Sequence, residues 1–263
     1  MDKQLTGSSV EVLHLLVEER SRQVADFMRW AAKKEENDSD SLRWAQRSDI
    51  ALSEQAASHF PAEWWGLTVF TCFWWREPIA AIVEIFQQPL DPNDARRHLD
   101  QIELPAGSIS SHRTQRGHTG ARNALVGACE HRAEFERILT TDLGGFDSRF
   151  QTLWNLGASD WGRTTSYDLI LRAGAIGVGG HHYAPEFAYL EGSTGPSRGF
   201  ERVWGVGVQE RGGPWCEALL AAWISQWSAV AQTAGVHWPG KAYDAGDLEN
   251  ALCIYQERGQ PCD

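Results

Sequence analysis

The chain has 263 residues and a mass of 29.4 kDa, which is enough for one large domain or two small ones with a buried core. Its formal net charge of -11 excludes a protein that coats nucleic acid through bulk electrostatic attraction, because that mode of binding needs a basic surface. A local basic groove is still compatible with this charge. Hydrophobic residues make up 42% of the chain and 13 residues are Trp, a composition that excludes a solvated linker and indicates a globular protein.

Apolar residues recur at helical spacing through the first half of the chain. Val10 and Leu13 lie in the first such stretch, after Ser8 and Ser9 as candidate caps, and this pattern predicts one long helix. The helices predicted in this half cover residues 9–34, 42–58, 62–75, 92–101 and 121–139. The Gly, Ser and Pro content of residues 104–120 predicts a loop.

The second half continues the helical pattern. The helices predicted there cover residues 146–156, 163–174, 200–204, 214–234 and 246–257. The glycine-rich stretch 174–186 is not expected to form a regular helix. The best candidate for a strand, residues 203–210, is short and interrupted by glycine. The sequence therefore predicts an all-α protein.

Cysteine content and the N-terminus bear on the compartment. The five cysteines are odd in number and include no Cys-x-x-Cys pair, so we expect neither a disulfide framework nor a zinc ribbon but a reducing cytoplasm. The N-terminus does not have the pattern of a secretory signal. The apolar run 64–75, about 12 residues, is too short to span a bilayer. We therefore expect a cytoplasmic protein with no membrane partner.

Residues 154–174, WNLGASDWGRTTSYDLILRAG, predict one helix ending, a tight turn and a second helix beginning. One interpretation is an ordinary helical hairpin, in which Gly162 makes the turn and Thr164 or Thr165 caps the second helix. The other is that the free backbone N–H groups at the start of that helix form an anion site suited to a DNA phosphate. Both interpretations stay open at this point.

The hairpin resembles that of the helix-hairpin-helix DNA glycosylase superfamily. Leu156, Gly162, Thr165 and Ser166 match four places of its motif, with a longer connection between the first two. Members with a lyase step carry a lysine just before the conserved threonine, and Thr164 stands at that place here. The resemblance thus implies a helix-hairpin-helix glycosylase-like fold and a monofunctional enzyme that uses water as the nucleophile.

Two further segments are similar to one branch of that superfamily. These are AYLEGSTGPSRGFERVWG, residues 188–205, and DLENALCIYQERG, residues 247–259. They resemble the α-glutamyl/putrescinyl-thymine pyrophosphorylase-like proteins and the helical domain found with hydroxymethyluracil DNA kinases, although the acidic and lysine positions of the C-terminal motif are lost. The resemblance spans about residues 146–259. It implies an N-terminal helical region, 1–145, followed by a helix-hairpin-helix and base-pocket region, 146–263, together forming one glycosylase-like unit.

Cleavage of an N-glycosidic bond develops positive charge on the sugar, which a nearby carboxylate can stabilise while it activates water. Placing the superfamily's pattern on residues 185–191 brings its catalytic aspartate to Leu190 or, with a slip of one residue, to Glu191. Glu191 is the first candidate, and Glu186 and Asp168 are the alternatives. Glu191 could instead cap the loop that follows it.

Candidate contacts to the DNA backbone come from three segments. Exposed amides, hydroxyls and guanidinium groups suit phosphate. The predicted loop that ends at Arg122 is the most basic stretch of this acidic protein. The candidates are Gly162, Arg163, Thr164 and Thr165 in the hairpin, Ser193, Thr194 and Arg198 after the catalytic candidate, and Arg113, Arg116 and Arg122 in the basic loop. Each segment could equally be an ordinary exposed turn.

A flipped base needs flat or hydrogen-bonding neighbours, and we expect these to be His181, His182, Tyr183 and Tyr189. Adjacent histidines point in different directions and no His-Glu-x-x-His spacing exists, so no metal or other cofactor is expected. The Trp64-Trp65 and Trp74-Trp75 pairs are expected in the core rather than in a stacking platform.

Three functions fit these residues. The first is a monofunctional DNA glycosylase that flips a modified pyrimidine out of DNA, plausibly phage DNA, and hydrolyses its N-glycosidic bond. The second is a transferase that displaces pyrophosphate from an activated hydroxymethyl-pyrimidine in DNA with an amino compound. The third is a non-catalytic sensor of modified DNA.

Overall fold

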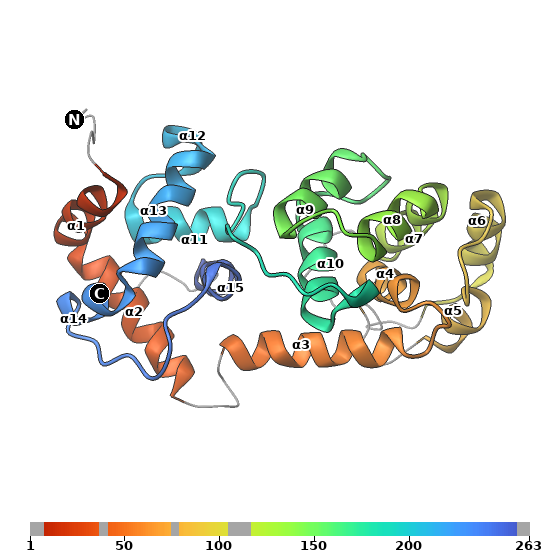
Figure 1. Ribbon diagram of the computed structural model, residues 1–263, viewed down its shortest axis with the longest axis horizontal. Coiled ribbons are helices and arrows are strands. Elements are labelled where there is room, and N and C mark those ends of the chain that lie inside the picture. Colours follow the sequence, from red (N-terminus) through yellow and green to blue (C-terminus); the bar gives the residue numbers. More distant parts are fainter. Residues whose placement is uncertain (1–7, 37–41, 75–78, 105–116, 257–263) are drawn as a thin grey trace. The chain divides into compact units, whose positions relative to one another are not determined.

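The computed structural model describes residues 8–36, 42–74, 79–104 and 117–256. All regular elements within these ranges are helices (Figure 1), and no strand occurs among them. The all-α class is therefore confirmed. The glycine-broken stretch 203–210 holds the end of one helix and the start of another. Within the same ranges, no helix combines the length and the apolar character needed to cross a membrane.

The chain divides into two compact units. The terminal unit joins Met1–Arg47 to Pro185–Asp263, and the central unit is Ser48–Ala184. The boundary predicted between 145 and 146 lies inside the central unit, between two helices that pack against each other, α8 (Arg132–Thr140) and α9 (Phe146–Asn155). The division follows packing between segments that are distant in sequence, which helical periodicity does not report.

The central unit is organised around α4 (Glu63–Phe73). Residues 64–73 are all buried, as expected for a helix that is apolar on every side, and α4 packs against α7, α8 and α10. Trp64 and Trp65 lie in the core as predicted, and the Trp65 indole N–H donates to the Phe86 carbonyl at 2.7 Å. The other helices of this unit are α5 (Ala80–Ile85), α6 (Pro92–Gln101), α7 (Gly117–Glu130), α10 (Arg163–Ile176) and the 3-10 turn η1 (Val178–Gly180), while α3 (Leu42–Ala57) contains the boundary.

The terminal unit has an aromatic core. Trp223 is fully buried, with ring centroids 4.8 Å from Trp204, 5.1 Å from Phe27 and 5.5 Å from Trp227. The high Trp content is thus partly explained by burial in this core. The helices are α1 (Ser9–Glu19), α2 (Ser21–Glu35), α11 (Gly195–Trp204), α12 (Val208–Arg211), α13 (Gly213–Ser225), α14 (Trp227–Thr233) and α15 (Ala245–Tyr255).

Three helices predicted as continuous are each broken at one residue. Arg20, His131 and Gln226 take φ near -110° with ψ between 17° and 26°, so 9–34, 121–139 and 214–234 each become two helices. Each breaking residue still donates its N–H to the preceding helix and accepts from the following one. The breaks therefore lose little hydrogen bonding, and no Pro or Gly marks them in the sequence. Packing decides them: α1 packs on α13, whereas α2 packs on α11.

The two segments that carry the branch resemblance meet in the terminal unit. Helix α11 packs closely on α15, with Gly199 against the Leu252 backbone and Gly195 against the Cys253 side chain. A Cβ added at Gly199 would lie 2.1 Å from the Leu252 carbonyl oxygen, and one at Gly195 would lie 2.6 Å from the Cys253 Sγ. Glycine at these two positions allows the helices to approach each other.

Substituting Gly199 by Ala is expected to destabilise the terminal unit. The added methyl group cannot avoid the Leu252 backbone without separating α11 from α15, and overpacking of this kind costs about 1–3 kcal/mol. Urea unfolding measures the loss. Gly207→Ala is the control, because its Cβ would come no closer than 3.4 Å to another atom. A Gly199→Ala protein as stable as the parent would contradict this account of the crossing.

Candidate functional site

The predicted hairpin is formed by α9 and α10, which pack against each other. The connection between them is anchored by Trp161, which is 3% exposed. Its indole N–H donates to the Ala124 carbonyl at 2.7 Å, and its ring meets Phe135 edge to face at 4.8 Å. The conspicuous Trp in this turn therefore fixes the connection to α7 and α8, and the turn is more than a flexible linker.

The residues after Trp161 open to solvent at the start of α10. Gly162 is the N-cap, and it and Thr164 are exposed, while Thr165 is half-buried. Because the N-cap residue is glycine, it makes no side-chain hydrogen bond to this end of the helix. The first turn of an α-helix leaves backbone N–H groups without an intrahelical acceptor, so this end has the character of an anion site. Thr164 and Thr165, which were predicted to cap this helix, lie inside it and do not occupy the N-cap position.

The arginines predicted to contact DNA are placed differently from one another. Arg163 is 5% exposed, with its guanidinium 4.6 Å from the Tyr167 ring centroid, so its charge is directed into the protein. Arg122 is half-buried and donates to the Ile102 carbonyl at 2.7 Å. Arg113 and Arg116 lie outside the described residues. The exposed part of the hairpin thus offers backbone and hydroxyl groups rather than guanidinium groups.

Asp168 is buried in the central unit beside Arg172. The two side chains are 3.8 Å apart and nearly inaccessible, and Arg172 also donates to the Asp168 carbonyl at 2.7 Å. The Arg172 guanidinium lies 3.6 Å from the Trp74 ring centroid. Removing one partner of a buried pair leaves an uncompensated charge. Asp168 therefore has a clear role in the core, and of the three candidate carboxylates it is the least accessible.

Of the predicted base-pocket residues, His182 and Tyr183 lie against Gly174 of α10. His182 is exposed and its Nδ1 is 3.3 Å from the Gly174 carbonyl oxygen. His181 and Tyr183 are half-buried, and burial raises the pKa of Tyr183 to about 12, only partly opposed by the charge of Arg149. The Tyr183 hydroxyl is buried and has no hydrogen-bond partner among the described residues.

Arg149 is not among the residues that the sequence predicts to be functional. It is fully buried, its guanidinium lies 4.6 Å from the Tyr183 ring centroid, and it donates to the carbonyls of Ile138 and Gly144. Cations are stabilised at helix C-termini, so this guanidinium ties the end of α8 to the start of α9. An arginine in the first turn of a helix resembles a surface residue in sequence, and no local signal distinguishes it.

Segment 186–191 of the terminal unit carries the two other candidate carboxylates. Glu186 and Glu191 are exposed, and Phe187 is an unusually exposed aromatic residue at 39%. Glu191 lies against the start of α13, because a Cβ added to Gly213 would be 2.6 Å from the Glu191 Oε2. Glu191 therefore lies at the surface of the terminal unit, beside the N-terminus of α13.

Glu217, one turn into α13, is a site residue that sequence reasoning missed. Its Oε2 accepts the Ala188 N–H at 3.0 Å, and its Oε1 accepts the Leu190 N–H at 2.6 Å. Tyr189, between these amides, is buried and has a φ of 52°, a value that is uncommon for a bulky residue. The only sequence signal is an isolated acid in an apolar helix, which does not reveal its partners.

The segment after Glu191 is largely used inside the fold. The hydroxyls of Ser193 and Ser197 donate to the Leu190 carbonyl at 2.8 and 2.6 Å, so Ser193 does not present its hydroxyl to a phosphate in this structure. Thr194 and Arg198 are exposed. Of the three residues predicted to bind phosphate here, two are accessible.

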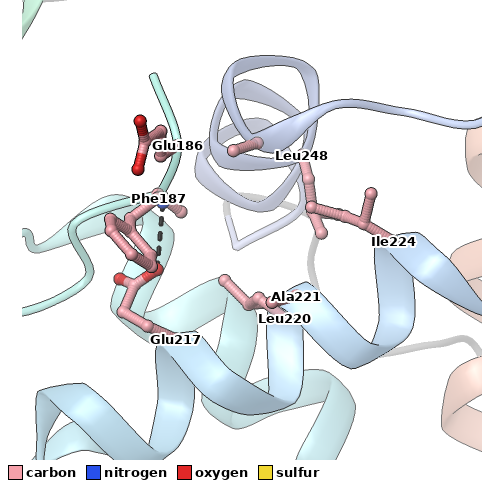
Figure 2. Close-up of a pocket in the computed structure, with 9 residues that line it drawn as sticks. Glu186, Phe187, Glu217, Leu220, Ala221, Ile224 and Leu248 are labelled. Carbon is pink, nitrogen blue, oxygen red and sulfur yellow. Dashed lines mark hydrogen bonds between the residues drawn. The ribbon is translucent and has the colours of Figure 1, made fainter. Parts of the chain in front are cut away.

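A small pocket opens beside this segment. In Figure 2 the Glu217 side chain extends from α13 toward the backbone segment that carries Glu186 and Phe187. Ile224 and Leu248 lie on the opposite side of the pocket. The space in it that water-sized groups can occupy is about 10 Å³, room for about one water molecule, so the pocket does not enclose a nucleotide.

The predicted site residues therefore fall into two sets. The hairpin, Asp168 and residues 181–183 belong to the central unit, and Glu186, Tyr189, Glu191 and the loop after it belong to the terminal unit. Each set is described within its own unit. Among the described residues, no three His, Cys, Asp or Glu side chains are grouped as metal ligands.

Comparison with known proteins finds no matching family model, no matching curated protein and no matching solved structure.

The pKa of Tyr183 generates a prediction about alkaline stability. The unfolded chain releases this proton near the ordinary value of 10.0, whereas the folded protein holds it until about 12. Stability is therefore fully present below pH 10 and is lost as the pH rises toward 12. In Tyr183→Phe that loss is absent, while stability at pH 8 changes little because the hydroxyl has no partner. Thermal unfolding from pH 8 to 11.5 measures it, and parallel curves for the two proteins would contradict the assignment.

Proposed function

We propose that this protein is a monofunctional DNA glycosylase that acts on a modified pyrimidine, binding the DNA backbone at the start of α10 and hydrolysing the N-glycosidic bond. The observation that carries the proposal is the exposed, uncapped N-terminus of α10, held in position by the buried Trp161. A phosphate there would accept hydrogen bonds from backbone N–H groups and interact favourably with the helix dipole. Neither interaction requires a basic surface, which the net charge of -11 does not provide.

The chemistry assigned to Glu191 is electrostatic and general-base catalysis. A carboxylate beside the sugar stabilises the positive charge that develops as the glycosidic bond breaks, and it accepts a proton from the attacking water. Glu191 is exposed and lies at the start of α13, so it can meet a substrate without a rearrangement of the core. Asp168, paired with Arg172, serves the fold in this proposal. Thr164, in the place of a lyase lysine, leaves water as the nucleophile.

The proposal includes the compartment and the source of the DNA. Cys129 and Cys216 are buried thiols that form no disulfide with the described residues, which supports a reducing cytoplasm. Burial raises the pKa of Cys129 and of Cys216 to about 11, so neither is suited to act as a thiolate nucleophile. A cytoplasmic enzyme that removes modified pyrimidines would act on phage DNA as an antiviral defence.

The pocket favours a second candidate, transfer of an amino compound to an activated hydroxymethyl-pyrimidine in DNA. Glu186 and Glu217 contribute two carboxylates to its lining, Phe187 contributes an exposed ring, and the floor is aliphatic. A protonated amine is attracted by carboxylates and by an aromatic face. Incorporation of a labelled amine into such DNA, without release of a base, would favour this candidate over the glycosylase.

Adding a negative charge at the hairpin is expected to weaken DNA binding. Thr164→Asp places a carboxylate at the second position of α10, where it stabilises the helix but competes with a phosphate. We expect the affinity for double-stranded DNA to fall about tenfold and the salt dependence of binding to decrease. Asn123→Asp, an exposed change of equal charge on α7, is the control. Equal effects of the two changes would assign the loss to net charge and not to the hairpin.

Release of a base by the unaltered protein tests the chemistry. DNA from phages with differently modified pyrimidines is incubated with the protein, and abasic sites are counted. In Glu191→Gln we expect the rate of base release to fall about 100-fold or more, with a smaller effect in Glu186→Gln. Binding without abasic sites on any such DNA would refute the glycosylase and leave the transferase or a sensor of modified DNA, which incorporation of the labelled amine distinguishes.

A further inference from the structure

We infer that Glu217 is a positioning residue: its carboxylate holds residues 188–190 in the kinked conformation that presents Phe187 and Glu191 at the surface of the terminal unit. The functional half of this inference rests on the proposed function. The conformational half rests on the geometry of the two hydrogen bonds and of Tyr189, and it can be tested without a substrate.

One carboxylate can accept both amides only because the chain is kinked between them. In an extended strand, amides two residues apart are separated by roughly 6.6 Å along the chain, too far for two oxygens that share one carbon. The φ of 52° at Tyr189 bends the backbone so that the Ala188 and Leu190 N–H groups reach the two oxygens of Glu217. The kink and the pair of hydrogen bonds therefore form one geometric unit.

The conformation at Tyr189 is costly for a residue with a Cβ, and the surrounding structure must maintain it. The hydrogen bonds from the Ala188 and Leu190 amides to Glu217, at 3.0 and 2.6 Å, provide this support. The Leu190 carbonyl is held from the other side by Ser193 and Ser197. Backbone strain of this kind occurs frequently at functional sites, and here it lies between the exposed ring of Phe187 and the candidate Glu191.

The kink determines what faces outward. Ala188, Tyr189 and Leu190 are buried, whereas Phe187 and Glu191 on either side of them are exposed. Loss of the Glu217 contacts would release the segment toward an ordinary extended conformation and change the direction of both flanking side chains. A displacement of about 1 Å in a catalytic group costs up to roughly 100-fold in rate, so a residue that touches no substrate can control the reaction through this segment.

The experiment compares Glu217→Gln with Glu210→Gln, an exposed glutamate on α12. Glutamine offers one acceptor oxygen and directs its NH₂ toward the second amide, so at least one of the two bonds is lost. We expect hydrogen exchange at the Ala188 and Leu190 amides to accelerate at least about tenfold, with other amides of the unit unchanged. Unchanged exchange at both amides, or faster exchange throughout the unit, would overturn the inference.

The effect of Glu217 on the proposed reaction is measured as the rate of base release from the same modified DNA. We expect Glu217→Gln to lower kcat about tenfold with KM little changed. In a Tyr189→Gly background the Glu217→Gln effect shrinks toward none, because glycine adopts a positive φ without support. A loss of equal size in both backgrounds, or full activity with accelerated exchange, would overturn the positioning role. If the unaltered protein releases no base, the proposed function fails. The hydrogen-exchange rates then still test whether Glu217 holds the kink.

Discussion

The central unit depends on the complete burial of α4. Every residue from 64 to 73 is removed from solvent, and each apolar side chain buried in this way contributes roughly 1.5–3 kcal/mol. The helices α7, α8 and α10 are positioned by packing against this one helix. The hairpin inherits its position from them, since α10 packs on α4 directly and the connection before it is fixed through Trp161 to Ala124 of α7.

Both candidate surfaces follow the same physical pattern, in which one buried group fixes the backbone and its sequence neighbours become exposed. In the hairpin the buried group is Trp161, and the exposed neighbours are Gly162 and Thr164. In the terminal unit the buried group is residues 188–190, whose backbone is held by Glu217, and the exposed neighbours are Phe187 and Glu191. Elements fixed in this way can present polar groups without paying the ordering entropy of a loose loop.

Burial also gives a structural role to several residues that the sequence predicted to be functional. Arg163, Asp168 and Ser193 each carry a group suited to DNA or to catalysis, yet each satisfies contacts inside its own unit. Gly195 of the GSTGP segment, together with Gly199, likewise allows α11 to approach α15. Fewer predicted residues remain accessible: Gly162 and Thr164 at the start of α10, His182, Thr194, Arg198, and the two carboxylates of segment 186–191.

The sequence alone determined the all-α class, the location of most helices and the burial of Trp64 and Trp65, because helical periodicity and local apolar runs are properties of neighbouring residues. It also predicted the turn at Gly162 and named Glu191 as the first candidate for a catalytic carboxylate. Only the tertiary structure decided the breaks at Arg20, His131 and Gln226, the joining of the N-terminal and C-terminal segments in one unit, and the partners of Arg149 and Glu217. Such contacts join residues far apart in the chain, and no local pattern records which distant backbone groups a buried charge will meet.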